Sequence, residues 1–248
     1  MSDEWMPTIR FPLSPDSFGR LPRNSAYRYE YLAGQACLNP RPKHYHALLA
    51  LQKLPVDHDL VIRQARQRDL DHLVPLFASC FEHIQPFGSL DDGARRLASR
   101  QALQRTWQGG DGPWIQEASF VACQGRDLIG CILITLLPKG DPCAWDSYHW
   151  SVPPPLNCIE QCLGRPHLTW VFVRCDHAGQ GAGSCLLAVA VNQLIAMGFT
   201  ELLSTFMIGN DASALWHWRN GFRLLAHPGS YRTSALRNEI KTTKSQRS

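Results

Sequence analysis

The chain has 248 residues, a formal net charge of +4 and 44% hydrophobic residues. It is long enough to bury a full core, and it has no apolar run of the roughly 20 residues that a membrane-spanning helix needs. The small charge, with no long basic stripe, argues against nucleic acid as a principal ligand. An acidic N-terminus without an apolar stretch behind it and nine scattered cysteines favour a cytoplasmic protein.

Residues 1–57 are predicted to form an N-terminal appendage. Alternating aromatic residues over 27–32, a glycine turn and a second short apolar run indicate a small hairpin. Residues 46–54 are predicted to form a short helix, with His44 and His46 at its solvated start. The sequence assigns no function to this appendage.

The main domain is predicted over residues 58–236. Its first elements are a strand over 60–65, a helix that starts after Asp69 and is kinked or shortened by Pro75, a helix over 90–107, and strands over 119–123 and 128–137. A proline-rich stretch at 138–167 is too long for an ordinary connection and predicts a functional loop. The polar tail at 237–248 is expected to be mobile.

The segment from Leu168 to Phe222 carries the clearest functional signal. It reads as strand, glycine turn, helix, strand and helix, and Gly179-Gln180-Gly181-Ala182-Gly183 lies directly between the first strand and the first helix. Glycines let main-chain N–H groups converge, and the helix N-terminus adds a positive dipole end, so the turn suits a phosphate. The alternatives are a nucleotide phosphate site and a purely structural connection.

Two patterns in this segment resemble the GNAT superfamily of N-acetyltransferases. Val173, Gly179, Gly181 and Gly183 match its strand-turn-helix signature, and the helix continues with Ser184. Further along the chain, Asn210 and the pair Gly221-Phe222 match the signature of the last helix. This chain departs from the family at three places: Cys175 replaces a proline, Ala178 replaces an arginine or glutamine, and His217 replaces a tyrosine.

The resemblance implies an α/β fold of the α+β type, with a mixed, mostly antiparallel central sheet flanked by helices. It also implies acetyl-CoA or another acyl-CoA as co-substrate, with no metal. The residues that would hold it are Phe172, Val173, Ala178, Gly179, Gly181, Ala182, Gly183, Ser184 and Asn210. Alanine at 178 removes one phosphate contact but no backbone donor, and a neutral hydrogen bond is worth about 0.5–1.5 kcal/mol.

The implied reaction is direct attack of a primary amine, on a small molecule or a protein, upon the thioester. In the family, strands four and five splay apart, which would leave the N–H groups of Phe172 and Val173 free for the ligand. His217 stands where a family tyrosine protonates the departing thiolate, so it could be the general acid, or it could simply pack beside Trp216 and Trp218.

The sequence does not identify a general base. The candidates are Glu117, Asp146, His149, Glu160 and His167, each of which could equally be an ordinary surface group. Aromatic residues in the 138–167 loop, among them Trp150, indicate an acceptor with an apolar or ring-bearing body.

Two other chemistries find less support. An acyl-cysteine intermediate on Cys175 or Cys185 is disfavoured, because the one nearby histidine is His177 and buried structural cysteines are common. Cys158 and Cys162, with a histidine five residues later, do not have a standard zinc spacing.

Two rival functions use the same fold. The first is a non-catalytic module that binds acyl-CoA, which the departures at Ala178 and His217 favour. The second is an interaction scaffold that recruits a partner through residues 1–57. The acceptor, the acyl-chain length and the oligomeric state stay open.

Overall fold

The computed structural model describes residues 9–23, 27–40, 44–56, 59–125, 127–140, 150–207 and 210–225. The strands are β1 (Ile9–Pro12), β2 (Tyr27–Leu32), β3 (Gln35–Pro40), β4 (His44–Ala50), β5 (Val61–Gln64), β6 (Phe120–Gln124), β7 (Asp127–Pro138), β8 (Gly164–Val173), β9 (Glu201–Met207) and β10 (Arg223–Leu224). The helices are α1 (Pro15–Gly19), α2 (Leu70–Cys80), α3 (Asp92–Trp107), α4 (Ala182–Ala196) and α5 (Asp211–Arg219). None of these helices is long and apolar enough to cross a membrane.

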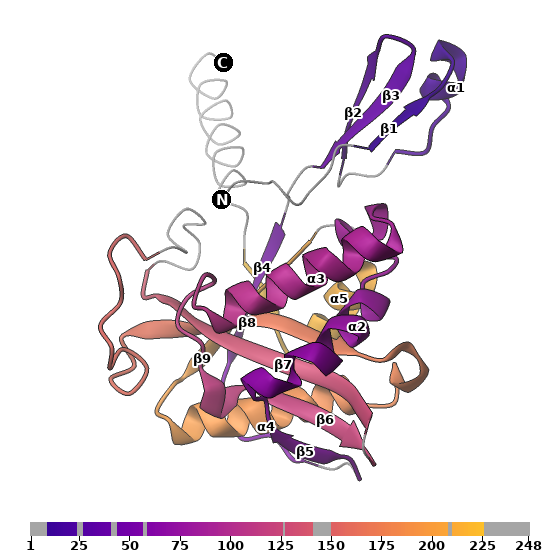
Figure 1. Cartoon of the computed structure of the whole chain (residues 1–248). Helices are drawn as coiled ribbons and strands as arrows, with labels where there is room; N and C mark the ends of the chain where they lie inside the picture. The colour runs from indigo at the N-terminus through magenta and orange to yellow at the C-terminus, as the bar shows by residue number, and fades with distance from the viewer. Residues whose placement is uncertain are drawn as a thin grey trace, which may run out of the picture.

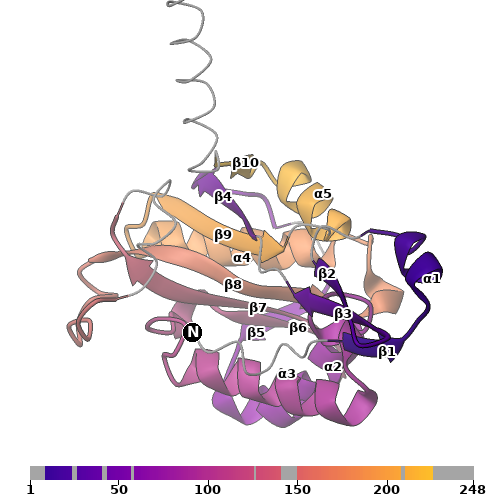
Figure 2. The same ribbon diagram turned by 90° about the horizontal axis from the view of Figure 1, so that it is seen from above.

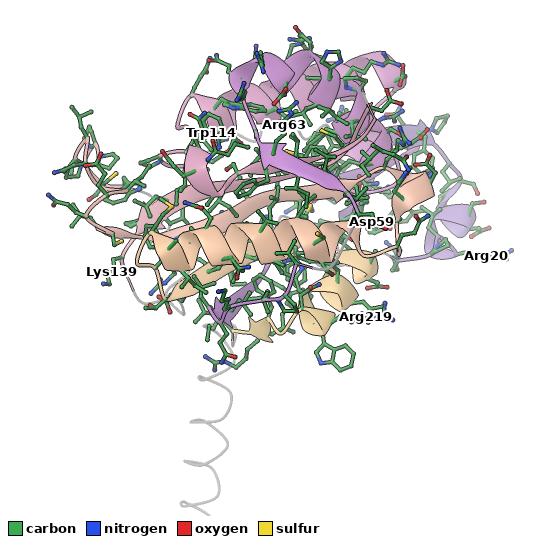
Figure 3. The ribbon with its side chains drawn as sticks, turned by 90° about the horizontal axis from the view of Figure 1, so that it is seen from below. Arg20, Asp59, Arg63, Trp114, Lys139 and Arg219 are labelled. Carbon is green, nitrogen blue, oxygen red and sulfur yellow. The ribbon has the colours of Figure 1, made fainter. Side chains whose placement is uncertain are left out.

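The strands form a three-stranded sheet, β1-β3-β2, and a seven-stranded sheet in the order β10-β4-β9-β8-β7-β6-β5. The large sheet has α2 and α3 on one face and α4 and α5 on the other (Figures 1 and 2). Figure 3 shows Arg63 and Trp114 on the side of α2 and α3, and Arg219 on the side of α5. The predicted fold class, a mostly antiparallel central sheet flanked by helices, is confirmed.

The centre of the large sheet is covered on both faces. Nine successive residues of β7, from Ile129 to Leu137, are buried, as expected for a strand between two helical layers. On β8 the side chains alternate: Val171 and Val173 pack in the core beside α4, and Trp170 and Phe172 pack in the core beside α2 and α3. The same strand therefore contributes to both cores.

Most predicted elements of the main domain are present within a few residues of their expected limits. Helix α2 runs for 11 residues with Pro75 inside it, so the proline does not end it. β8 begins at Gly164, so the connection from β7 spans 139–163 and is shorter at its C-terminal end than expected. The tail at 237–248 lies outside the described residues.

The helix predicted at 46–54 is wrong. Residues 44–50 form β4, which pairs along its whole length with β9 and at two residues with β10. The predicted hairpin is confirmed as β2 and β3, with the turn at Ala33 and Gly34 in the left-handed region. A boundary at residue 57 would therefore divide β4 from the sheet to which it belongs.

The divergence of β8 and β9 gives the sheet an opening. They are the one parallel pair among the described strands, and they pair only at His167–Leu203 and Leu168–Ser204. The register of β8 on β7 also shifts just after Leu168, which makes Thr169 the extra residue of a bulge. Beyond this point the two strands run apart. The backbone N–H and C=O groups of β8 that face this side have no hydrogen-bond partner on β9.

We predict that β4, unlike the small sheet, contributes strongly to the stability of the main domain. A chain that begins at residue 58 loses a strand between β9 and β10 and exposes the buried side of β9, so it should unfold at least about 10 °C lower than the full chain. A matched chain that begins at residue 41 keeps β4 and should unfold cooperatively, close to the full chain. Thermal unfolding followed by circular dichroism measures both, and equal stability of the two truncations would contradict this role.

Candidate functional site

A pocket of about 1720 Å³ lies where β8 and β9 diverge, and residues from both faces of the sheet line it. The lining includes Gly181 and Asn210 beside α4 and α5, and Phe81 and Arg105 beside α2 and α3. The pocket therefore passes through the layer of the sheet. Nine predicted site residues line it: Phe172, Val173, Ala178, Gly179, Gly181, Gly183, Ser184, Asn210 and His217. The tenth, Ala182, is buried in the first turn of α4 with 2% exposure.

The start of α4 can bind an anion at the pocket wall. Gly179 and Gly181 have φ angles of 76° and 89°, which glycine adopts without steric cost. The first hydrogen bond of the helix runs from the Cys185 N–H to the Gly181 carbonyl at 2.9 Å, so the preceding amides of the first turn have no partner within the helix. Together with the positive end of the helix dipole, these amides suit a phosphate.

Close packing also explains the glycine at 183. A Cβ atom there would lie 3.1 Å from Nε1 of Trp216, so α4 approaches α5 more closely than a larger residue would allow. Asn210 caps α5, since its Oδ1 accepts a hydrogen bond from the Ser213 N–H at 3.1 Å. These contacts fix the two helix starts that line the same side of the pocket.

The ladder between β7 and β8 determines which amides of β8 face the opening. The Arg174 N–H donates to the Ile129 carbonyl at 2.7 Å, and hydrogen-bonded pairs alternate along an antiparallel ladder. The Phe172 N–H therefore points to β7, while those of Val171 and Val173 point toward β9. Phe172 lines the pocket, but the backbone donor expected from it belongs to Val171 instead.

A chain of hydrogen bonds crosses the floor of the pocket. The Thr135 hydroxyl donates to the Asp111 carbonyl at 3.0 Å and lies 2.8 Å from the Thr169 hydroxyl. A carbonyl oxygen only accepts, so the Thr135 hydroxyl uses its hydrogen on Asp111 and must accept from the Thr169 hydroxyl. The Thr169 hydroxyl then accepts in turn from Nδ1–H of His167, which is 3.1 Å away. Nε2 of His167 then accepts from the Thr205 hydroxyl at 3.1 Å.

The chain of hydrogen bonds continues to β4. Nδ1 of His46 lies 3.0 Å from the Thr205 hydroxyl and donates to it in the same direction. His46 is 5% exposed, and both His44 and His46 line the pocket. The expectation that these two histidines mark a solvated helix start is therefore wrong. The segment HYHALLA does not alternate between polar and apolar residues, so no local signal reveals this strand.

Burial keeps the inner histidines neutral at pH 7. Desolvation, together with the nearby His46, His217 and His44, lowers the pKa of His167 to about 3. Desolvation lowers the pKa of His217 to about 4, against a smaller opposing effect of the hydrogen bond to Ser213. The pocket floor is therefore polar without the positive charge that protonated imidazoles would bring.

His217 is held tightly by its neighbours. Nδ1 lies 2.7 Å from the carbonyl oxygen of Ser213, so Nδ1 carries the proton, and Nε2 accepts from the Ser204 hydroxyl at 2.7 Å. The ring stacks on Phe206 with centroids 4.2 Å apart. Its role as general acid stays a prediction, and this geometry adds a requirement, namely that Nε2 must first take up a proton.

The predicted base candidates lie in different places. Glu117 and Glu160 are exposed and lie outside the pocket, and Asp146 and His149 fall outside the described residues. Of the five candidates, His167 is the one that lines the pocket, and it is neutral and bonded at both ring nitrogens.

Asp111 is the one carboxylate among the described residues that line the pocket. It pairs with Arg105 at 2.8 Å and accepts a hydrogen bond from Thr106 at 2.8 Å, so its charge is already compensated. Sequence reasoning did not single out this group, or the hydroxyls of Thr169, Ser204 and Thr205, because their importance depends on the neighbours that the fold supplies.

The cysteines of the site do not resemble nucleophiles. Cys175 is exposed, and Cys185 is buried. Cys80 lines the pocket, but its thiol donates to the Val173 carbonyl at 3.1 Å, and burial raises its pKa to about 12. Within the described ranges, no group of three or more histidine, cysteine or acidic residues could hold a metal ion.

A family model described as "Acetyltransferase (GNAT) family" matches residues 77–222, which is more than half of the chain. The match includes the glycine turn, β8, β9 and both helix starts at the pocket. No curated protein matches the chain.

Solved structures of several acetyltransferases are similar to this chain. A GNAT family acetyltransferase from Brucella melitensis in complex with acetyl-CoA is 17% identical, with a TM-score of 0.45 over 68% of this chain and 89% of that one. An N-acetyltransferase from Thermoplasma acidophilum in complex with coenzyme A is 14% identical, with a TM-score of 0.46 over 67% and 91%. Because these identities and TM-scores are low, the structures show only that this chain is similar to them. Membership of the family rests on the family model.

The lowered pKa values predict a loss of stability in acid. The unfolded chain binds protons near the ordinary histidine pKa of 6.5, whereas folded His217 does so only near 4, so stability is complete above pH 6.5 and falls between pH 6.5 and 4. The contribution of His217 is about 3 kcal/mol. Urea unfolding at pH 7 and pH 4 should therefore show a smaller drop for His217→Gln than for the wild type, while the exposed control His72→Gln keeps the full drop. Equal drops in all three proteins would refute the assignment.

Proposed function

The chain belongs to the acetyltransferase (GNAT) family, and on that premise we propose that it transfers an acyl group from acyl-CoA, acetyl-CoA in the first instance, to a primary amine. The observation that supports this most directly is a single pocket that joins the glycine-rich start of α4 to the free edge of β8. One end suits a pyrophosphate and the other offers backbone donors to a thioester. An extended ligand with a phosphate at one end and a reactive carbonyl at the other fits this arrangement.

Different residues would bind different parts of acyl-CoA, according to their position along the pocket. The amides that follow Gly181 would bind the pyrophosphate, and Ala178 adds no side-chain contact to it. The N–H groups of Val173 and Val171 would bind the pantetheine arm and the thioester oxygen, since they point toward the opening and no strand pairs with them there. Asn210 and Ser213 shape the wall on the α5 side.

The reaction would then be a direct displacement. The amine nitrogen attacks the thioester carbonyl, negative charge develops on the carbonyl oxygen, and the C–S bond breaks as the amide forms. The Val171 N–H is a fixed donor for the developing charge, and removing one such donor typically costs about 10²–10³ in rate. The proton that leaves the nitrogen ends on the sulfur of CoA, whose thiol has an ordinary pKa near 8.5.

His217 would act mainly through Ser204. Its Nε2 holds the Ser204 hydroxyl at 2.7 Å in the pocket wall, and at pH 7 the neutral ring has its one proton committed to Ser213. We therefore assign His217 a positioning role at neutral pH. Direct proton donation by its imidazole would occur only in the acid range.

The eight described cysteines are free thiols, which supports a cytoplasmic location.

Binding of acetyl-CoA tests this proposal. In isothermal titration we expect micromolar binding by the wild type and at least a hundredfold loss in Gly181→Glu, because the carboxylate would occupy the phosphate position and repel it. The matched control is Gly125→Glu in the turn between β6 and β7. This glycine also has a positive φ, 61°, but it lies in open space away from the pocket.

The control tests whether a glutamate at a left-handed position weakens binding by destabilising the fold as a whole, because both variants carry this change. Equal loss of binding in both variants would attribute the effect to general destabilisation. Absence of binding by a folded wild type would reject the proposed co-substrate and favour the scaffold function. Binding without turnover on any amine would favour the non-catalytic module.

A further inference from the structure

We infer that the acceptor is an aromatic amine, a primary amine attached directly to an aromatic ring, which enters the pocket uncharged. This inference rests on the proposed acyl transfer and specifies its second substrate. Two independent properties of the pocket carry it: its aromatic lining next to the reaction centre, and the absence, among the described lining residues, of a carboxylate that is free to pair with an ammonium ion.

The aromatic lining adjoins the amide that would bind the thioester oxygen. Trp170 precedes Val171 on β8, and its indole is fixed by a hydrogen bond from Nε1 to the Thr106 hydroxyl at 2.9 Å. Phe81 and Phe87 pack edge-on to this indole, with ring centroids at 5.9 and 6.4 Å, and all three residues line the pocket. A planar apolar ring can extend this cluster in the same edge-to-face geometry, which aromatic rings prefer.

Trp150 adds a second aromatic surface from the connection between β7 and β8. Its Nε1 donates to the Leu136 carbonyl at 2.9 Å, which holds the indole against the sheet, and Pro153 and Pro154 continue the apolar lining. The described part of this connection thus contributes a mostly apolar wall, with Ser151 as its one polar side chain at the pocket. This agrees with a ring-bearing acceptor.

The charges in the pocket do not suit an ammonium ion. The one carboxylate among the described lining residues, Asp111, is neutralised by Arg105 at 2.8 Å. An aliphatic amine, with a pKa near 10, is charged in all but about one part in a thousand at pH 7. Placing that charge in the pocket without a free carboxylate would leave only the aromatic faces to offset its desolvation cost. An aromatic amine avoids this cost, because its lone pair is delocalised into the ring and it is weakly basic.

The hydrogen-bonded chain on the pocket floor consists of imidazoles and hydroxyls and so offers no negative charge that could bind an ammonium ion. It runs from His46 through Thr205, His167, Thr169 and Thr135 and ends on the backbone carbonyl of Asp111, which cannot take up a proton. An aromatic amine needs no deprotonation before it attacks. Its N–H bond breaks only as the amide forms, and the thiolate that leaves forms the S–H bond, so the step balances without another group.

A panel of acceptors tests the inference with the full chain and acetyl-CoA, using release of the CoA thiol as the readout. Aniline is compared with benzylamine, which adds one methylene between ring and nitrogen, and with the polycation spermidine. We expect kcat/KM for aniline at pH 7 to exceed that for benzylamine by at least about tenfold, and spermidine to be the poorest acceptor. Between pH 6.5 and 9 the aniline rate should stay level, while the benzylamine rate should rise with pH.

Two variants locate the acceptor. Trp150→Ala and Phe81→Leu should each raise the KM for aniline at least threefold and leave the KM for acetyl-CoA within twofold of the wild type. Trp218→Ala is the matched control, since this tryptophan on α5 is 74% exposed and lies outside the pocket. An unchanged KM for aniline in both pocket variants would overturn the placement of the ring.

The outcomes separate this inference from the proposed function. Preference for benzylamine or spermidine would overturn the aromatic amine and leave acyl transfer standing. Binding of acetyl-CoA with no thiol release on any acceptor would overturn both. Faster turnover of aniline with a level pH profile would support both.

Discussion

The limited pairing of β8 with β9 is the constraint on which the site depends. Backbone N–H and C=O groups inside a protein need partners, and a sheet normally supplies them from the neighbouring strand. Here the pairing stops after two residues, at Leu168 and Ser204, and the amides of Val171 and Val173 face an opening instead. The bulge at Thr169 adds an unpaired residue at the same point and turns its hydroxyl into the polar chain. An extended ligand can then take the place of the missing strand.

The rest of the fold keeps this opening stable. Polar side chains from β4, β7, β8 and β9 bond to one another across the floor, so the buried hydroxyls and imidazoles have partners without a charge being buried. On one face α4 brings its amide-rich start to the opening, and on the other the aromatic cluster of α2 packs against Trp170 and Phe172. Figure 2 shows these two layers enclosing the sheet. A pocket with an anion site at one end and an apolar neutral interior at the other follows from this arrangement.

The structure gives a physical reason for two departures from the family signature. Alanine at 178 leaves the phosphate site to backbone donors, and the positive φ angles of Gly179 and Gly181 arrange those donors without a long side chain. At 217, histidine fills a position between α5 and β9 where both ring nitrogens find partners and the ring stacks on Phe206. A tyrosine has one polar atom and could not make both bonds, so the chain has a different local network around the same opening.

The sequence by itself determined the elements whose signals are local. The glycine turn before α4, the apolar run of β7, the helical period of α3 and the hairpin of β2 and β3 depend on near neighbours, and each was predicted close to its observed limits. Only the tertiary structure decided what depends on partners distant in the chain. The segment HYHALLA becomes a strand because β9, more than 150 residues later, pairs with it, and that pairing carries His46 into the pocket. The direction of the Phe172 amide and the neutral state of His167 are likewise consequences of register and burial, which no local pattern encodes.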